Sequence, residues 1–461
     1  MNHYDLIIIG SGSGNAIPSE LADEWRIAII ERGTFGGTCL NVGCIPSKMF
    51  VLPADRAEYA KHSPRLGVNT QFHGVDWPAI RDRVFGRIDP ITEGGRKYRR
   101  DGHPNITLIE GTARFTGERT VRVDGRTLTA DRILVATGGR PSIPPIAGLS
   151  EVPYHTSDTI MRLDELPPRL GIIGGGFIAV ELGHVFSAYG SKVTLFNRSD
   201  RLLRSHDQDV SDRFTELFAD RVDLRLGELP HLVRTNGSEI ELVLDDGAQG
   251  GERVEAFDQL LVATGRSPNS EDLHPTVAGI SVHPDGRIEV DDTMATSASA
   301  VWAIGDVANP HQLKHLANRE AEIAFWNMVH PNDPRRGDTS VLPHAVFSDP
   351  QVGSVGYTEA EAQAHGHEYV VGRRDYGGTA YGWALEDDSS FAKVIIDLAT
   401  KHILGAHILG PQAATLIQLI AQAMTFGQRA DELATVPYYV HPALTEVVEN
   451  ALLDGLAKIP S

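Results

Sequence analysis

Two parts of the chain show the same pattern of apolar and polar positions. Residues 5–10 and 26–31 are almost continuous apolar runs, and such runs are typical of parallel strands that are buried on both faces. The interval between them has room for one helix, and Pro18 limits where that helix can begin. The pattern predicts a βαβ unit whose first turn is formed by residues 10–15.

The second copy of this pattern covers residues 170–196. An apolar strand ends at Gly174, a helical stretch continues to Tyr189, and residues 192–196 form another apolar run. Each copy is followed by a further strand and an Ala-Thr-Gly turn, at residues 133–138 and 260–265. The internal repeat predicts an α/β fold with two Rossmann-like nucleotide-binding domains in succession.

The rest of the chain shows a different pattern. Residues 301–306 resemble one more buried strand, a helical stretch covers residues 315–329, and a segment rich in Pro, Asp and Arg then marks a boundary. Beyond it, residues 393–397 and 403–409 alternate around a polar turn like a hairpin, and residues 413–426 have helical spacing. The carboxy-terminal region is predicted to be an α+β domain.

A chain of 461 residues is too long for one ordinary core. We expect the first nucleotide-binding domain to comprise residues 1–147 and 271–333, the second to comprise residues 148–270, and the last domain to begin at residue 334. Hydrophobic residues make up 41% of the chain, which is near the average of globular proteins and excludes a disordered or fibrous class.

The formal net charge of −19 opposes binding to nucleic acid or to anionic lipid. The amino terminus has no basic leader, and no run approaches the length of a membrane span. We therefore expect a cytoplasmic protein with neither nucleic acid nor membrane as a partner.

The strongest local motif is Gly36-Gly37-Thr38-Cys39-Leu-Asn-Val-Gly43-Cys44-Ile-Pro46-Ser-Lys48, which contains both cysteines of the chain. In an ideal helix a spacing of five residues would hold the two Cα atoms beyond disulfide reach, so Gly43 and Pro46 must distort the turn. A structural bridge closing so small a loop would contribute little stability. Redox use is favoured over a structural bridge, and a metal site lacks further cysteine ligands.

The two glycine turns indicate nucleotide binding. Glycines allow backbone amides to approach a pyrophosphate, and an acid at the end of the second strand, here Glu31, can hold a ribose hydroxyl. Asn15 replaces the third glycine of this pattern, so an ordinary tight turn is the alternative. The second copy has no such acid but has Arg198, Arg201 and Arg204, which favours NADPH unless these arginines merely solvate a loop.

A histidine near the carboxyl terminus has an acid five residues away. His441 could cycle a proton near neutral pH, and Glu446 could fix its tautomer. Most of the 19 histidines of the chain will be surface or packing residues, so spacing alone is weak support.

Taken together, these motifs resemble the class I pyridine nucleotide-disulfide oxidoreductases over essentially the whole chain. The cysteine motif, the paired Ala-Thr-Gly turns, Gly305-Asp306 and His441-Pro442 with Glu446 occur in the order typical of this family. The resemblance implies that the first domain binds FAD, that the second binds NADPH, and that the last is a dimerisation domain.

The resemblance also implies roles for individual residues, which fall into three groups. FAD would be held by Gly10, Gly12, Gly14, Glu31, Gly37, Thr38, Lys48, Ala113, Thr137, Gly138, Gly305 and Asp306. NADPH would be held by Gly174, Gly176, Ala179, Glu181, Arg198, Arg204, Gly265 and Arg266. Catalysis would use Cys39, Cys44, Lys48, Glu181, His441 and Glu446, without a metal.

In this family, electrons pass from NADPH through FAD to the cysteine pair. The resemblance implies that Cys44 lies nearest the flavin and that Cys39 attacks a small-molecule disulfide. His441, oriented by Glu446, would protonate the leaving thiol. Because this dyad comes from the second subunit in the family, we expect a homodimer in which each active site is shared.

Finer details resemble the branch that reduces mycothione, a disulfide of a cysteinyl aminosugar-inositol. They include residues 12–15, 49–51, 85–91, 154–158, 184–188, 441–444 and 446–453. Glutathione and trypanothione reductases remain alternatives. Dihydrolipoyl dehydrogenase is disfavoured because it would need an acid at the position of Asn197. Mercuric reductase and the large thioredoxin reductases are disfavoured because they use further cysteine or selenocysteine groups near the carboxyl terminus. A non-catalytic flavin-binding protein is disfavoured because it would not need the six catalytic residues.

Overall fold

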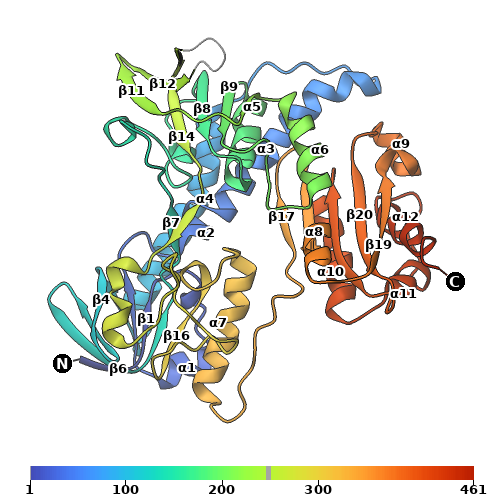
Figure 1. Cartoon of the computed structure of the whole chain (residues 1–461). Coiled ribbons are helices and arrows are strands. Elements are labelled where there is room, and N and C mark those ends of the chain that lie inside the picture. The colour runs from blue at the N-terminus through green and yellow to red at the C-terminus, as the bar shows by residue number, and fades with distance from the viewer. Residues whose placement is uncertain (1, 246–250, 461) are drawn as a thin grey trace.

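The computed structural model describes residues 2–245 and 251–460. Its ribbon forms three regions (Figure 1). The first contains a mainly parallel sheet with two antiparallel strands at one edge, the second contains a parallel sheet, and the third is an antiparallel sheet with helices. Among the described residues, no helix combines the length and apolar character needed to cross a membrane. The predicted α/β architecture, with two Rossmann-like regions and an α+β carboxy-terminal region, is confirmed.

The first sheet has seven strands in the order β3-β2-β1-β6-β5-β4, and β16 pairs with β6. Its strands are β1 (Asn2–Ile9), β2 (Ile27–Glu31), β3 (Ile106–Glu110), β4 (Ala113–Gly117), β5 (Thr120–Val123), β6 (Arg126–Val135) and β16 (Val301–Ala303). β16 runs parallel to β6, so a segment far along the chain completes the sheet that β1 begins. Helices α1 (Ser19–Glu24) and α7 (Lys314–Val329) pack on one face.

The helix predicted after the first glycine turn is divided into two short pieces. A single 3-10 turn covers Ser13–Asn15, and α1 begins only at Ser19. Pro18 precedes α1 with an extended backbone (φ −56°, ψ 140°). Because proline has no N–H and disfavours helical geometry in the residue before it, a continuous helix cannot form here.

The second sheet has the strand order β10-β9-β8-β14. Its strands are β8 (Arg169–Ile173), β9 (Lys192–Asn197), β10 (Asp223–Leu226) and β14 (Gln259–Val262), and all neighbours are parallel. Helices α5 (Phe177–Tyr189) and α6 (Gln208–Ala219) share a core with one face. The other face packs against an antiparallel sheet of β11 (Leu232–Asn236), β12 (Glu239–Asp245) and β13 (Glu252–Phe257).

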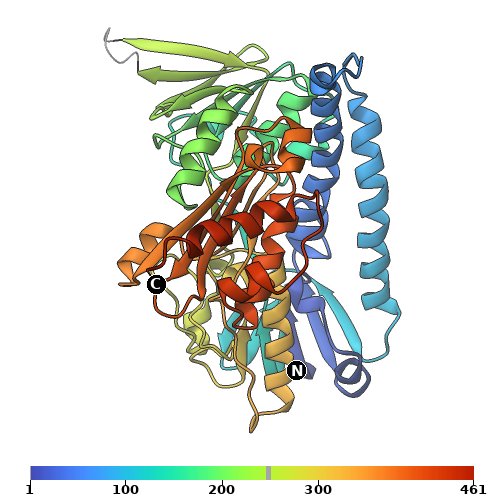
Figure 2. The ribbon, with the colours of Figure 1, turned by 90° about the vertical axis from the view of Figure 1, so that its right-hand side faces the viewer.

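Three helices with few sheet contacts connect the two nucleotide-binding regions to each other. They are α2 (Gly37–Asn41), α3 (Cys44–His62) and α4 (Trp77–Asp101), and Figure 2 shows α3 and α4 running along one side of the molecule. The side chain of Phe50 on α3 stacks on Trp77, and the hydroxyl of Tyr189 on α5 donates a 2.6 Å hydrogen bond to the Phe50 carbonyl. A short ribbon of β7 (Gly139–Pro141) and β15 (Arg266–Pro268) also joins the regions.

The carboxy-terminal region is a five-stranded antiparallel sheet with helices. Its strands follow the order β17 (His344–Val346), β18 (Val352–Gly356), β21 (Ile403–Leu409), β20 (Phe391–Asp397) and β19 (Tyr369–Asp375). Its helices are α8 (Glu359–Ala364), α9 (Ala380–Leu385), α10 (Ala413–Thr425), α11 (Ala430–Thr435) and α12 (Thr445–Leu456). The predicted hairpin is β20 with β21, and the predicted helices at residues 315–329 and 413–426 are α7 and α10.

Within residues 2–245 and 251–460, the remaining regular elements are short 3-10 helices in connecting segments. They cover Ser63–Leu66, Leu149–Glu151, Ile160–Arg162, Glu271–Leu273, Pro275–Ala278, Gly305–Val307 and Tyr376–Gly378.

A buried ion cluster joins the second nucleotide-binding region to the carboxy-terminal sheet. Lys393 on β20 has a side chain that is 1% exposed, and its Nζ lies 2.8 Å from Asp207 Oδ1 and 2.6 Å from Glu359 Oε2. Burial alone would lower the pKa of Lys393, but the surrounding carboxylates raise it above its ordinary value. Asp207 also caps α6 by accepting from the Asp209 amide, so one cluster fixes the start of α6 against β20.

Replacing Lys393 with methionine should destabilise the protein strongly. The Lys393→Met variant would keep most of the side-chain volume but leave Asp207 buried without its cation, a change that costs about 3–5 kcal/mol. Thermal melting of the purified variant should show a lower midpoint than the wild type. Lys97→Met, which removes an exposed charge on α4, is the matched control, and equal midpoints for all three proteins would contradict the prediction.

Candidate active site

A cavity of about 540 Å³ opens at the carboxyl ends of the strands of the first sheet. Residues from every predicted part of the FAD site line it: Gly10, Gly12, Glu31, Gly37, Thr38, Lys48, Ala113, Thr137, Gly138, Gly305 and Asp306. The same cavity is also lined by Cys39, Cys44 and Glu181. The structure therefore brings most of the residues predicted for FAD and both cysteines to one cavity.

Backbone segments form the floor of this cavity at very close approach. Gly10 has φ +104°, and a Cβ atom placed on it would lie 2.3 Å from the carbonyl oxygen of Ala136. A Cβ on Gly37, which has φ +72°, would lie 2.7 Å from the Cα of Gly12. Glycine is required at both positions, and the bare backbone leaves amides accessible as a pyrophosphate site requires. The cavity volume and this cradle fit a dinucleotide such as FAD.

Glu31 at the end of β2 is held in a fixed orientation. Its Oε2 accepts hydrogen bonds from the amide and the hydroxyl of Ser11, at 2.9 and 2.7 Å, and its Oε1 accepts from the Gly33 amide at 2.8 Å. A carboxylate in this place suits a ribose hydroxyl. Ser11 was not among the predicted site residues, because its role depends on the folded turn.

The two cysteines are adjacent because the helix is interrupted between them. α2 ends at Asn41 and α3 begins at Cys44, with Gly43 as its N-cap residue. A Cβ on Gly43 would lie 2.9 Å from the carbonyl oxygen of Thr38 and 3.3 Å from the Cα of Cys39. Gly43 thus permits the close approach that the sequence spacing requires, while Pro46 lies within the first turn of α3, where proline is tolerated.

The side chain of Asn41 holds the segment between the cysteines in place through three hydrogen bonds. Its Nδ2 donates to the carbonyl oxygens of Phe35 and Gly37, at 2.9 and 3.0 Å, and its Oδ1 accepts a 2.6 Å hydrogen bond from Thr92 on α4. Asn41 is buried, so these bonds replace its contacts with water. The residue lies within the recognised motif, but its bond to Thr92 could not be read from the sequence.

Both cysteines are free, so the structure shows the dithiol form of the pair. The pKa of Cys44 is lowered to about 7, first because Cys39 donates a hydrogen bond to it, and also because Lys48 is nearby; partial desolvation acts in the opposite direction. The same hydrogen bond, together with desolvation, raises the pKa of Cys39. Near neutral pH the negative charge therefore resides on Cys44, at the start of α3, where a helix favours it.

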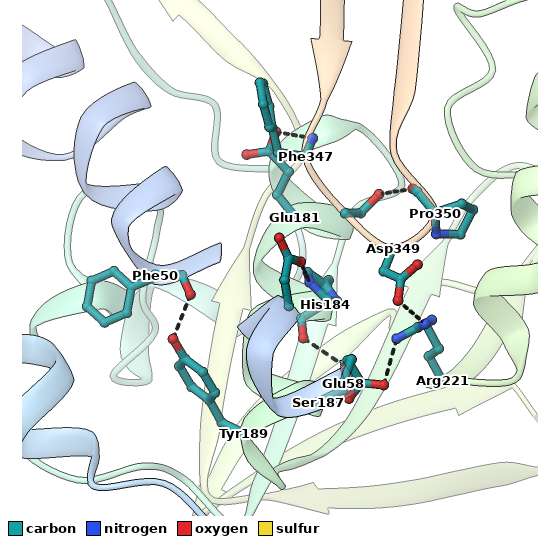
Figure 3. Close-up of polar contacts among 12 residues, drawn as sticks. Phe50, Glu58, Glu181, His184, Ser187, Tyr189, Arg221, Phe347, Asp349 and Pro350 are labelled. Atoms are coloured by element: carbon teal, nitrogen blue, oxygen red, sulfur yellow. Dashed lines mark hydrogen bonds and ion pairs between the residues drawn. The ribbon is translucent and has the colours of Figure 1, made fainter. Parts of the chain in front are cut away.

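Lys48 and Glu181 form an ion pair beside Cys44. Lys48 Nζ lies 2.6 Å from Glu181 Oε2, and the Glu181 side chain is 5% exposed. Glu181 Oε1 accepts a 2.8 Å hydrogen bond from the amide of Phe347, just after β17, as Figure 3 shows. The ring of Phe347 also faces Lys48 Nζ at 4.7 Å. A residue of the carboxy-terminal region thus helps to hold the pair that faces the dithiol.

A second polar layer lies behind this pair, between α3 and α5. His184, one turn after Glu181, is completely buried, and its Nε2 lies 2.9 Å from Asp55 Oδ1. Next to it, Arg221 pairs with Glu58 on α3 at 3.0 Å and also with Asp349 (Figure 3). The sequence motifs did not identify these residues as part of the site. Their contacts hold α3 against α5 and against the segment after β17.

A second cavity lies at the carboxyl ends of the strands of the second sheet. The predicted residues Gly174, Gly176, Arg198, Arg204 and Gly265 line it. Arg201 also lines it, and the Asn197 amide group donates to the carbonyls of Ser199 and Arg201, which fixes the arginine-bearing loop. The structure therefore brings these five predicted residues to one cavity.

Four predicted cofactor residues do not line the cavity of the nucleotide to which they were assigned, although Glu181 does form its predicted pair with Lys48 near the flavin site. Ala179 is fully buried in the core and Gly14 packs against Ala136 and Ile8, so both permit close packing and neither lines either of the two cavities described above. Arg266, assigned to NADPH, faces the first cavity, where its guanidinium donates a 2.6 Å hydrogen bond to the Gly139 carbonyl. Glu181 likewise lines the first cavity and not the second. The antiparallel pairing of β15 with β7 turns Arg266 to that side.

His441 and Glu446 form the predicted dyad away from both cavities. His441 Nδ1 lies 2.7 Å from Glu446 Oε1, and the histidine side chain is 70% exposed whereas that of Glu446 is 16% exposed. Within the described part of one chain, neither residue lines the cavity that contains the cysteines. The exposed side chains of Val436, Tyr438 and Val440 precede the dyad.

Charge changes at Lys48 and Glu181 should move the titration of Cys44 in opposite directions. In a Cys39→Ser background, which leaves a single thiol, the rate of alkylation by iodoacetamide against pH reports the pKa of Cys44. Lys48→Met removes the cation and should raise the midpoint by about one pH unit. Glu181→Gln removes an anion that raises the pKa of Cys44 and should lower the midpoint. Unchanged midpoints in both variants would refute this electrostatic account.

Comparisons with known proteins agree with this geometry. Residues 4–322 match the family model described as pyridine nucleotide-disulphide oxidoreductase, and residues 342–452 match its dimerisation domain. The chain is 46% identical to a mycothione reductase of Mycobacterium tuberculosis, over 98% of this chain and 99% of that protein. It is 34% identical to a mercuric reductase of Bacillus cereus, over 93% of this chain and 68% of that protein, and 32% identical to a dihydrolipoyl dehydrogenase of Haloferax volcanii, over 98% and 96%.

Among solved structures, a HOCl-induced flavoprotein disulfide reductase of Escherichia coli is similar, with a TM-score of 0.85 and 28% identity over 99% of this chain and 100% of that one. The sequence similarity covers nearly the whole length, and the structural similarity includes all three regions of the fold. The chain belongs to the pyridine nucleotide-disulphide oxidoreductase family.

Proposed function

We propose that this enzyme uses NADPH and FAD to reduce mycothione, the disulfide of mycothiol, through the Cys39–Cys44 pair. The observation that carries the proposal is the position of the dithiol in the wall of the dinucleotide cavity, beside the Lys48–Glu181 pair. The 46% identity to a mycothione reductase supports the choice of substrate. FAD, when bound, supplies the two-electron link between the pyridine nucleotide and the cysteine pair.

We assign Cys39 as the attacking thiol and Cys44 as the resolving thiolate, as in the family to which the chain belongs. Cys39 loses its proton to His441 of the partner subunit and attacks one sulfur of the substrate disulfide, forming a mixed disulfide. The first substrate thiol leaves with the proton that His441 returns. The Cys44 thiolate then attacks the sulfur of Cys39, the second thiol leaves and takes up a proton from solvent, and the Cys39–Cys44 disulfide forms. The substrate gains two electrons and the dithiol loses two.

The cofactor preference is assigned from the second cavity. Arg198 and Arg204 line it, and Asn197 occupies the place where an acid would bind the ribose hydroxyl of NAD. Guanidinium groups bind a phosphate at that position by charge-assisted hydrogen bonds. The assignment of residues 148–270 to NADPH, and of residues 1–147 with 271–333 to FAD, rests on these cavities and on the pairing of β16 with β6.

We also infer that the active site is shared between the subunits of a homodimer. The carboxy-terminal region matches the dimerisation domain of the family, and His441 is exposed although its partner Glu446 is well covered. A proton donor at the protein surface, outside the cavity of its own chain, needs a second copy to reach a cysteine. With no membrane or nucleic-acid partner implied by its charge, we place the enzyme in the cytoplasm.

The substrate is tested by parallel steady-state assays. Oxidation of NADPH and of NADH is followed at 340 nm with mycothione, oxidised glutathione and lipoamide. Turnover of mycothione with NADPH supports the proposal, whereas preference for lipoamide with NADH would identify a dihydrolipoyl dehydrogenase. Preference for oxidised glutathione would show that the substrate is a low-molecular-weight disulfide other than mycothione. If no disulfide of the three causes oxidation of NADPH or NADH, the assignment as a disulfide reductase is wrong.

Removal of the two arginines should weaken NADPH binding selectively. The Arg198→Ala/Arg204→Ala variant should raise the KM for NADPH about tenfold to hundredfold, as expected for lost hydrogen bonds to a charged group, with a smaller change for NADH. Arg234→Ala on β11, outside the cavity, is the control for loss of positive charge. An equal effect on both nucleotides would contradict the proposed phosphate contact.

Heterodimers of two inactive variants should regain activity. Cys39→Ser and His441→Ala subunits with different affinity tags are co-expressed, and the mixed dimer is purified through both tags. If the site is shared, one of its two sites contains both Cys39 and His441, so the mixed dimer should show about half of the wild-type activity. If each chain forms its own site, every site carries a lesion and the mixed dimer is inactive.

A further inference from the structure

Four basic side chains line the first cavity, and the structure pairs three of them with acids. Measured from the basic nitrogen to the carboxylate oxygen, the pairs are Arg32 with Asp272 at 3.0 Å, Lys48 with Glu181 at 2.6 Å, and Arg266 with Asp306 at 3.5 Å. The fourth is Lys314, the first residue of α7. In the part of the chain that the structure describes, Lys314 forms no ion pair with a carboxylate, so its positive charge is available to a ligand in the cavity.

A hydrogen bond holds the ammonium group of Lys314 at the first glycine turn. Its Nζ donates to the hydroxyl of Ser13 at 2.8 Å, and that hydroxyl donates to the side chain of Asn318, one turn further along α7, at 3.5 Å. Ser13 lines the cavity together with Gly10 and Gly12. An ammonium group has three N–H donors. Within the described residues, the bond to Ser13 is the only hydrogen bond of this Nζ, which leaves two donors for a ligand.

The amino end of α7 adds to the positive potential at this place. α7 has 16 residues, and its N-cap residue, Leu313, provides no side-chain cap. Backbone amides in the first turn of a helix have no acceptor within the helix, and the helix dipole makes this end attractive to anions. Gln312, Lys314 and Ala317 all line the cavity. The unpaired ammonium group and the helix end therefore both favour an anionic group of the ligand beside residues 10–13.

We propose that Lys314 pairs with the diphosphate of FAD and that Ser13 orients its ammonium group for this contact. The first glycine turn, to which Lys314 is tied, is where Gly10 permits the backbone approach that a pyrophosphate needs. The diphosphate is anionic at neutral pH, whereas the oxidised flavin ring and adenine are uncharged, so the diphosphate gains most from a cation. The proposal rests on the assignment of this cavity to FAD in the proposed function.

Equilibrium binding to the full-length chain, from which FAD has been removed, tests this contact. The change of flavin fluorescence on adding FAD or riboflavin gives their Kd values, and competition with FAD gives that of ADP. In Lys314→Met the Kd for FAD should rise about tenfold to hundredfold, as expected for a lost hydrogen bond between charged groups. ADP contains the diphosphate and should lose affinity by a similar factor, whereas riboflavin has no phosphate and should keep its Kd.

Two further variants separate the charge of Lys314 from general effects of substitution. Lys314→Arg keeps a cation and should retain most of the affinity for FAD. Lys192→Met removes an exposed charge on β9 and should leave all three Kd values unchanged. The temperature at which the purified holoenzyme releases FAD, followed by flavin fluorescence, provides a measurement that does not require the FAD-free protein. It should fall in Lys314→Met and stay at the wild-type value in Lys192→Met.

Equal FAD affinities and equal release temperatures for Lys314→Met and Lys192→Met would overturn the inference. A raised Kd for riboflavin in Lys314→Met would also overturn it, because the effect would then lie on the flavin ring or on the fold as a whole. Failure of the wild-type chain to bind FAD would instead contradict the cofactor assignment of the proposed function, so the two failures can be told apart.

Discussion

The active site depends on one close backbone contact, the approach of Gly43 to the Thr38 carbonyl and the Cys39 Cα. Any side chain at Gly43 would push α3 away from α2 and separate the two thiols. Because the contact interrupts the helix between the cysteines, Cys44 becomes the first residue of α3 and Cys39 can donate a hydrogen bond to it. The hydrogen bond between the thiols, which lowers the pKa of Cys44 and raises that of Cys39, therefore depends on this contact.

Side chains along α3 connect the cysteine pair to other parts of the molecule. Lys48 lies one turn after Cys44 and binds Glu181, and the next turns carry Asp55 and Glu58, which bind His184 and Arg221. Glu181 and Arg221 each contact the segment after β17, through the Phe347 amide and Asp349. Through these contacts the carboxy-terminal region, which also carries the exposed His441–Glu446 dyad, holds α3 in place.

Much of this arrangement could be predicted from the sequence, because it depends on local pattern. The two apolar repeats predicted the parallel strands of the first two sheets, and the spacing of Cys39, Gly43 and Cys44 predicted a distorted turn with redox chemistry. Residues placed by long-range packing could not be predicted. Lys314 reaches the cavity only because β16 pairs with β6 and brings the start of α7 beside the first glycine turn. Arg266 lines the first cavity and not the second because β15, which carries it, pairs with β7. The divided first helix followed from Pro18, whose effect was underestimated.

The central claim is that electrons leave the pyridine nucleotide through the Cys39–Cys44 pair, and anaerobic titration with NADPH tests it most directly. With the wild-type protein, one equivalent should produce two titratable thiols and a long-wavelength absorbance band from the Cys44 thiolate against oxidised flavin. In Cys44→Ser that band should be absent. Bleaching of the flavin by the first equivalent, with no new thiols and no long-wavelength band, would contradict the account.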